Sequence, residues 1–149
     1  MLTFEYHKSK YGNANLILRR GIPVLFPTIF GADITKTKEQ SIKTQEAALS
    51  AVFVFYLFLQ QNKISDNQLV DQNFLPLDIA DRLALYIPIK LQYLKSTDGV
   101  INIFSPKKLS ELALQSGRPE SYYINNNAFN IRIYYICDFL NFISAYGIK

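Results

Sequence analysis

Residues 41–63 read SIKTQEAALSAVFVFYLFLQQNK and are the most apolar, most clearly bounded segment of this 149-residue chain. Ser41 and Thr44 can each cap the unpaired N–H groups that a helix start leaves. Between residues 47 and 59 the only polar residue is Ser50. An ordinary surface helix keeps one apolar stripe, so this segment predicts a central helix that other elements cover nearly all round.

Two apolar faces of this helix have different predicted partners. The first face is expected to build the core with the last helix of the chain, and the second to lie under an N-terminal β region or the middle helices. The first comprises Leu49, Val52, Phe53, Tyr56 and Leu59, and the second Val54, Leu57 and Phe58. As a helix, residues 47–59 span about 20 Å, whereas a bilayer core is about 30 Å thick. A core helix is therefore favoured over a membrane span.

Composition is that of an ordinary soluble protein of one domain. The single cysteine, Cys137, excludes an internal disulfide, and the first ten residues lack the apolar run of a signal peptide. We therefore expect a reducing, cytoplasmic setting. The net charge of +4 is compatible with a polyanionic partner but is also common among soluble proteins.

The segment before residue 41 predicts a small β region. Residues 3–8 and parts of 14–19 alternate apolar and polar side chains, with turn-forming residues between them, which favours a β-hairpin. Residues 24–26 are predicted as a short third extended piece that Pro27 ends. The polar segment 31–40 has no apolar period and is predicted as a loop.

Four helical patterns follow the central one, and together they predict a mainly α fold of four to five helices behind a small N-terminal β-hairpin. They cover residues 66–72, residues 78–95 with a kink or break at Pro88, a helix from Ser105–Pro106 to about residue 115, and residues 126–146. The apolar run at 100–104 is of ambiguous type. The predicted division is a hairpin or arm over residues 1–30 and a helical domain over residues 31–149.

Residues that carry catalysis are scarce in this sequence. His7 is the only histidine and lies in the alternating pattern of a strand, and Cys137 sits among apolar residues of the last helix, where we expect a buried thiol. Metal-binding spacings and a glycine-rich phosphate loop are both missing. The prediction is that this chain is not a complete enzyme and holds no metal or cofactor.

Basic and amide residues bracket the two longest helical patterns. Three lysines approach the start of the central helix, and asparagines with Arg132 crowd the first turns of the last one. A helix start favours phosphate through its free N–H groups and its dipole. The alternative is that the asparagines only cap the helix and the lysines are solvated loop charges, and both interpretations stay open.

Three short motifs follow one another in an order that resembles a known family. They are Gly21-Ile22-Pro23-Val24 with Pro27 and Phe30, Ser41-x-x-Thr44-x-x-Ala47-Ala48-Leu49 leading into Phe55-Tyr56-x-Phe58-Leu59, and Asn130-Ile131-Arg132-Ile133 followed by Asp138-Phe139-Leu140-Asn141-Phe142-Ile143. This order is similar to the N-terminal core-binding domain of tyrosine recombinases, the phage-integrase superfamily. The similarity covers residues 20–62 and 125–146. Ala128 stands where the family usually has threonine, and Phe142 where it has tryptophan.

The resemblance implies a four-helix, SAM-like domain that clamps duplex DNA opposite a catalytic domain. The expected partners are double-stranded DNA, the chain's own C-terminal catalytic domain, and other recombinase protomers in a tetramer. The catalytic domain is absent from this sequence, so no catalytic residue is assigned. The expected DNA contacts are Lys36, Lys38, Lys43, Thr44, Asn127, Asn130 and Arg132. The alternative is a helical protein-interaction domain with no role on DNA.

Overall fold

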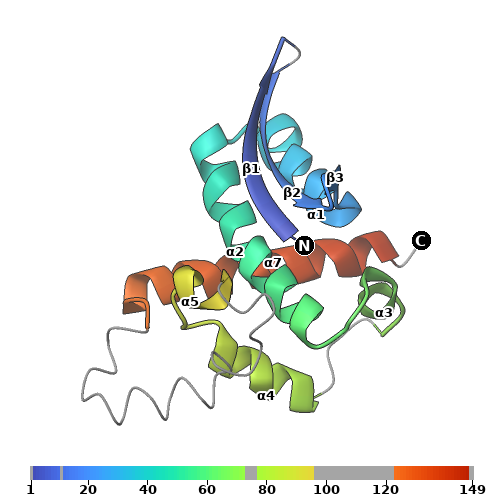
Figure 1. The fold of residues 1–149 in the computed structure, drawn as a ribbon. Coiled ribbons are helices and arrows are strands. Elements are labelled where there is room, and N and C mark those ends of the chain that lie inside the picture. The colour runs from blue at the N-terminus through green and yellow to red at the C-terminus, as the bar shows by residue number, and fades with distance from the viewer. Residues whose placement is uncertain (1, 11, 73–76, 96–122, 148–149) are drawn as a thin grey trace. The chain divides into compact units, whose positions relative to one another are not determined.

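A computed structural model describes residues 2–10, 12–72, 77–95 and 123–147 (Figure 1). The described part is mainly helical with a small antiparallel sheet, as the sequence predicted. The chain divides into two compact units. Unit 1 comprises Met1–Tyr56 and Arg132–Lys149, and unit 2 comprises Leu57–Ile131.

The sheet of unit 1 confirms the predicted hairpin. Strands β1 (Leu2–Ser9) and β2 (Gly12–Arg19) pair antiparallel in one register, and the short β3 (Ile22–Pro23) adds to the far edge of β2. The turn between β2 and β3 has positive φ at Arg20 (54°) and Gly21 (79°). A two-residue hairpin turn of this kind needs positive φ at both central positions, which is why glycine occupies the second.

Two expectations for the segment after β3 were wrong. Residues 24–26 are not an extended piece, because helix α1 begins at Leu25 and runs to Ala32. A π-helix, η1 (Asp33–Thr37), follows α1, so only residues 38–40 of the predicted loop are non-helical. Pro27 stands in the first turn of α1, where no N–H is needed. The carbonyl oxygen of Val24 accepts bonds from the amide (3.2 Å) and the hydroxyl (2.7 Å) of Thr28.

Helix α2 (Ile42–Gln61) is the predicted central helix. The Ser41 hydroxyl accepts a hydrogen bond from the Thr44 amide at 3.2 Å, so Ser41 caps the start. The side chains at positions 51–56 are all buried. The length and composition of α2 alone would also allow it to cross a membrane. Buried core helices of soluble proteins often share that length and composition.

Aromatic side chains make the core of unit 1. Tyr56 and Phe55 contact Phe139 of helix α7 (Asn126–Gly147), with ring centroids 5.9 and 6.3 Å apart, and Phe30 of α1 contacts the same ring at 5.2 Å. The predicted packing of Tyr56 on the last helix is therefore confirmed. The ring of Phe53 instead stacks on Phe4 of β1 at 5.9 Å, so that face of α2 is shared with the sheet.

Cys137 lies on the exposed side of α7, which corrects the expectation of a buried thiol. Its neighbour Ile136 and the nearby Phe139 are buried. Successive helix positions are rotated by about 100°, so a residue beside a core position in the sequence can face away from the core. Apolar neighbours in the sequence were therefore not evidence of burial for Cys137.

Unit 2 contains the helices predicted for the middle of the chain. These are α3 (Asp66–Gln72), α4 (Leu77–Tyr86) and α5 (Leu91–Lys95), so the pattern at 78–95 forms two helices with Pro88 between them. The Pro88 carbonyl accepts a bond from the Ile124 amide at 2.8 Å. The rings of Phe58 and Tyr86 meet edge to face at 5.4 Å. The helix predicted from Ser105 and the run at 100–104 lie outside the described residues.

Lys63 ends α2 in a conformation that favours glycine. Its φ is 55°, the Ile64 amide donates to the Leu59 carbonyl at 2.9 Å, and the Lys63 amide donates to the Gln60 carbonyl at 3.2 Å. These two bonds define a Schellman motif with lysine at the position that glycine usually occupies.

Replacing Lys63 with Gly is therefore expected to raise the free energy of unfolding by about 0.5–1 kcal/mol, because glycine adopts the left-handed conformation without steric cost. Urea unfolding followed by circular dichroism measures the change. Lys63→Ala is the control, since it removes the same charge and keeps the Cβ. Equal stability of the two variants would contradict this explanation.

Candidate nucleic-acid interface

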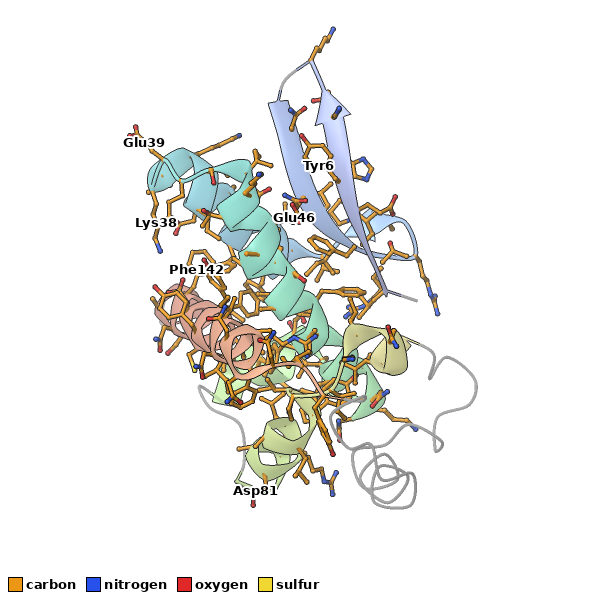
Figure 2. All side chains as sticks on the ribbon, turned by 90° about the vertical axis from the view of Figure 1, so that its left-hand side faces the viewer. Tyr6, Lys38, Glu39, Glu46, Asp81 and Phe142 are labelled. Atoms are coloured by element: carbon orange, nitrogen blue, oxygen red, sulfur yellow. The ribbon has the colours of Figure 1, made fainter. Side chains whose placement is uncertain are left out.

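Four of the seven expected contact residues lie in one corner of unit 1. We define the α2 corner as residues 33–46, which comprise η1, the following turn and the first turns of α2 (Figure 2). Lys36 and Lys43 are exposed there, and the hydroxyl oxygens of Thr44 and Ser41 lie 3.1 Å apart. The turn is closed by a bond from the Gln40 amide to the Ile34 carbonyl at 3.0 Å. The corner therefore presents ammonium and hydroxyl donors at a helix start.

The charges of the α2 corner balance one another. Its three lysines, Lys36, Lys38 and Lys43, are matched by three carboxylates, Asp33, Glu39 and Glu46. The Lys38 ammonium lies 3.8 Å from the Asp33 carboxylate, and Glu39 and Glu46 are both exposed. The corner can therefore donate directed hydrogen bonds but adds no excess positive charge.

The other three expected contacts lie on α7. Asn127 and Asn130 are exposed and three positions apart, so they share one side of the helix, in the part that belongs to unit 2. Arg132 belongs to unit 1 and is half-buried. Helix capping is done by Asn125, whose Oδ1 accepts a bond from the Ala128 amide at 2.8 Å. The capping interpretation therefore applies to Asn125, whereas Asn127 and Asn130 present amides to solvent.

The excess positive charge of the protein lies elsewhere in unit 1. Unit 1 has nine lysines and arginines against five carboxylates, whereas unit 2 has seven of each, so the whole net charge of +4 belongs to unit 1. Within unit 1 the sheet holds the largest share, with Lys8, Lys10, Arg19 and Arg20 against Glu5 alone. Counting charge by segment would have found these four residues, which the search at helix starts missed.

A buried pair of amide side chains joins the sheet to the α2 corner. The Gln45 Oε1 accepts bonds from the amide (2.8 Å) and the Nδ2 (3.1 Å) of Asn15, and the Gln45 Nε2 donates to the Gly31 carbonyl at 2.9 Å. The Asn15 Nδ2 also donates to the Ile42 carbonyl at 3.4 Å. β2, α1 and the first turns of α2 therefore share one hydrogen-bonded junction, which we call the Gln45 junction.

Gly31 is required at this junction because the helices approach each other closely. A Cβ on Gly31 would lie 3.0 Å from Cδ1 of Leu49 and 3.3 Å from Nε2 of Gln45. Both distances are shorter than ordinary van der Waals contact. The glycine thus lets its carbonyl reach the amide of Gln45.

No protein family, curated protein or solved structure matches this chain. Its function is therefore inferred from its own residues. Among the residues that the structure describes, His, Cys, Asp and Glu form no group of three that could hold a metal ion. What the described surface of unit 1 offers is an excess of cationic side chains on a sheet, with Lys8 and Lys10 at the end nearer a helix start rich in donors.

Proposed function

We propose that this chain is a DNA-binding module, the core-binding part of a site-specific tyrosine recombinase. The observation that carries the proposal is the concentration of the net charge of +4 in unit 1, which holds both the sheet and the α2 corner. Phosphate contacts supply most of the affinity of proteins for duplex DNA. The order of motifs over residues 20–62 and 125–146 supports the recombinase assignment, and with it a SAM-like helical domain.

The two parts of unit 1 would contribute differently to binding. The sheet supplies excess positive charge, and the α2 corner supplies directed donors from Lys36, Lys43 and Thr44. Asn127 and Asn130 of α7 would make further contacts with the DNA. Strand exchange itself belongs to a catalytic domain outside this sequence, so this module positions the recombinase on its site.

Fluorescence anisotropy with a labelled duplex tests the proposal. If about four to six phosphates are neutralised, a plot of log affinity against log salt concentration should have a slope of about −4 to −5. Replacing Lys36 and Lys43 together with Gln should make the slope less negative by about two. The matched control replaces Lys63 and Lys90 of unit 2 with Gln and should leave the slope unchanged. A chain that binds no duplex at low salt would refute the proposed function.

An interaction domain remains the second candidate, because large apolar side chains are exposed close together in unit 1. Ile22 at the end of the sheet and Leu25 at the start of α1 are 69% and 62% exposed. Exposed apolar patches often mark protein contacts. Sedimentation velocity separates the two candidates, since a chain that associates with itself or a partner but not with duplex DNA favours this one.

A further inference from the structure

The outer half of the β1–β2 hairpin projects from unit 1 without covering a core. We define the hairpin tip as residues 5–10 and 12–14. The residues from Glu5 to Lys10 are all exposed, and so are Gly12 and Asn13. Because successive strand residues point to opposite faces, both faces of the tip are open to solvent. The inner half differs, since Leu2, Ile17 and Leu18 are buried.

The tip extends past the beginning of α2. The Phe4–Phe53 stacking places the inner half of the hairpin against the middle of α2, and the Asn15–Ile42 hydrogen bond places the next positions against its first residue. Continuing along the hairpin, Lys8 pairs with Asn13 beyond that point. Figure 1 shows β1 and β2 extending beyond the start of α2. The tip and the α2 corner therefore project at the same end of unit 1.

Register determines which side chains of the tip face the α2 side. Phe4, whose ring stacks on α2, shares its face with Tyr6 and Lys8, because residues two apart in a strand point the same way. The partners across the strand on this face are Ile17, Asn15 and Asn13. Beyond the buried Asn15, this face presents an aromatic ring, an ammonium and an amide, and Lys10 of the turn adds a second positive charge.

We propose that the hairpin tip is a second DNA-contacting element, which lies in a groove of the duplex while the α2 corner holds an adjacent phosphate backbone. This inference rests on the proposed function. A two-stranded antiparallel ribbon fits the major groove of B-DNA. An isolated hairpin is marginally stable in water. The Gln45 junction compensates by fixing the base of the ribbon, so the tip is presented in a set direction before DNA binds.

Glu46 is the last residue of the α2 corner, and its negative charge opposes phosphate binding there. Figure 2 shows Glu46 on α2 between Tyr6 of the hairpin and Lys38 of the corner. Its side chain is exposed. A carboxylate at this place repels a phosphate backbone that bridges the tip and the corner. Removal of this single charge should therefore strengthen DNA binding. No such gain is expected if this surface does not contact DNA.

The experiment compares variants of the full chain in anisotropy titrations with the labelled duplex. Replacing Lys8 and Lys10 together with Gln should weaken binding about tenfold and make the salt slope less negative by about two. Glu46→Gln should strengthen binding severalfold. The Lys63 and Lys90 double replacement is the control for charge and should change neither quantity.

A shortened hairpin removes the tip without disturbing its base. Replacing residues 8–13 with Asn-Gly keeps His7 and Ala14 paired across a two-residue turn and leaves Asn15 unchanged, so the Gln45 junction stays intact. This variant should keep its melting temperature and lose at least as much DNA affinity as the double lysine variant. Full affinity in both variants, with the parent chain binding duplex DNA normally, would overturn the inference and leave the proposed function standing. If the shortened hairpin lost self-association and kept its DNA affinity, the tip would be a protein-contacting element, and the inference would also be overturned.

Discussion

Replacing Phe139 with Ala is expected to lower the free energy of unfolding by about 4 kcal/mol. The ring is fully buried and meets three others, those of Phe30, Phe55 and Tyr56, with centroids between 5.2 and 6.3 Å away. Those rings come from α1 and α2, so the side chain joins three helices of unit 1. Its removal costs the transfer of a large apolar group and leaves a cavity that rigid neighbouring rings fill poorly.

Urea unfolding at constant m-value measures this loss. Tyr134→Ala is the matched control, because Tyr134 is an aromatic residue of the same helix and is 65% exposed. It should change the free energy of unfolding by less than about 0.5 kcal/mol. Phe139→Leu should cost an intermediate amount. If Phe139→Ala were no more harmful than Tyr134→Ala, the aromatic cluster could not be the core of unit 1.

The sequence predicted the elements whose signals are strong and local. Residues 41–63 have an apolar content that only a buried helix satisfies, and the alternation at 3–8 has the period of a strand. Pro88 predicted a break, because proline removes a helical hydrogen bond and clashes with the preceding turn. Each of these signals depends on a few neighbouring residues, so tertiary context was not needed to interpret it.

Helix α1 and η1 were missed because their shared apolar face continues across residue 30, where the sequence was divided into a β region and a polar loop. Pro27, Phe30 and Ile34 are buried and follow one another at helical spacing. The pattern was divided at residue 30, so its first part was taken for extended chain and its second for a polar loop. Proline in the first turn of a helix costs little, and a sequence alone does not show whether a proline stands in a first turn or ends a strand.

The candidate site was predicted in part for a similar reason. Residues at helix starts were chosen, since the physics of anion binding there is clear, and the structure places four of them in the α2 corner. Whether nearby carboxylates offset the charge of those lysines depends on which acidic residues lie in the same corner. Glu46 is one of them because it stands in the first turns of α2. The excess charge lies on the sheet, with Lys8 and Lys10 at one end and Arg19 and Arg20 at the other. This distribution follows from the register of the hairpin.

Replacing Gln45 with Ala should lower the free energy of unfolding by about 3 kcal/mol. The side chain is buried, and its amide bonds to Asn15 and to the Gly31 carbonyl at 2.8–3.1 Å. Without it, the Asn15 amide and the Gly31 carbonyl remain buried with a lost partner, at about 1–3 kcal/mol for each such group. Gln45 lies on the same apolar stripe as Ala48 and Leu49. This spacing is visible in the sequence and could have identified Gln45 as a buried polar residue.

Gln45→Met separates the hydrogen bonds from the packing, because methionine keeps the length of the side chain and removes both polar atoms. It should be nearly as harmful as Gln45→Ala. Gln40→Ala is the control for losing an exposed glutamine at the same corner and should have little effect.

A double-mutant cycle between Gln45→Met and Asn15→Ala should give a coupling energy of about 1–2 kcal/mol, since the two side chains share a hydrogen bond. The junction also fixes the direction of the hairpin, so Gln45→Met should weaken DNA binding even at temperatures where the variant is fully folded. Hydrogen exchange checks that step directly. The amides of β2 near Asn15 should exchange faster in the variant, whereas those around Phe139 should keep their protection. Independent effects of the two substitutions, with unchanged exchange in β2, would mean that the sheet is held to α2 by its apolar contacts alone.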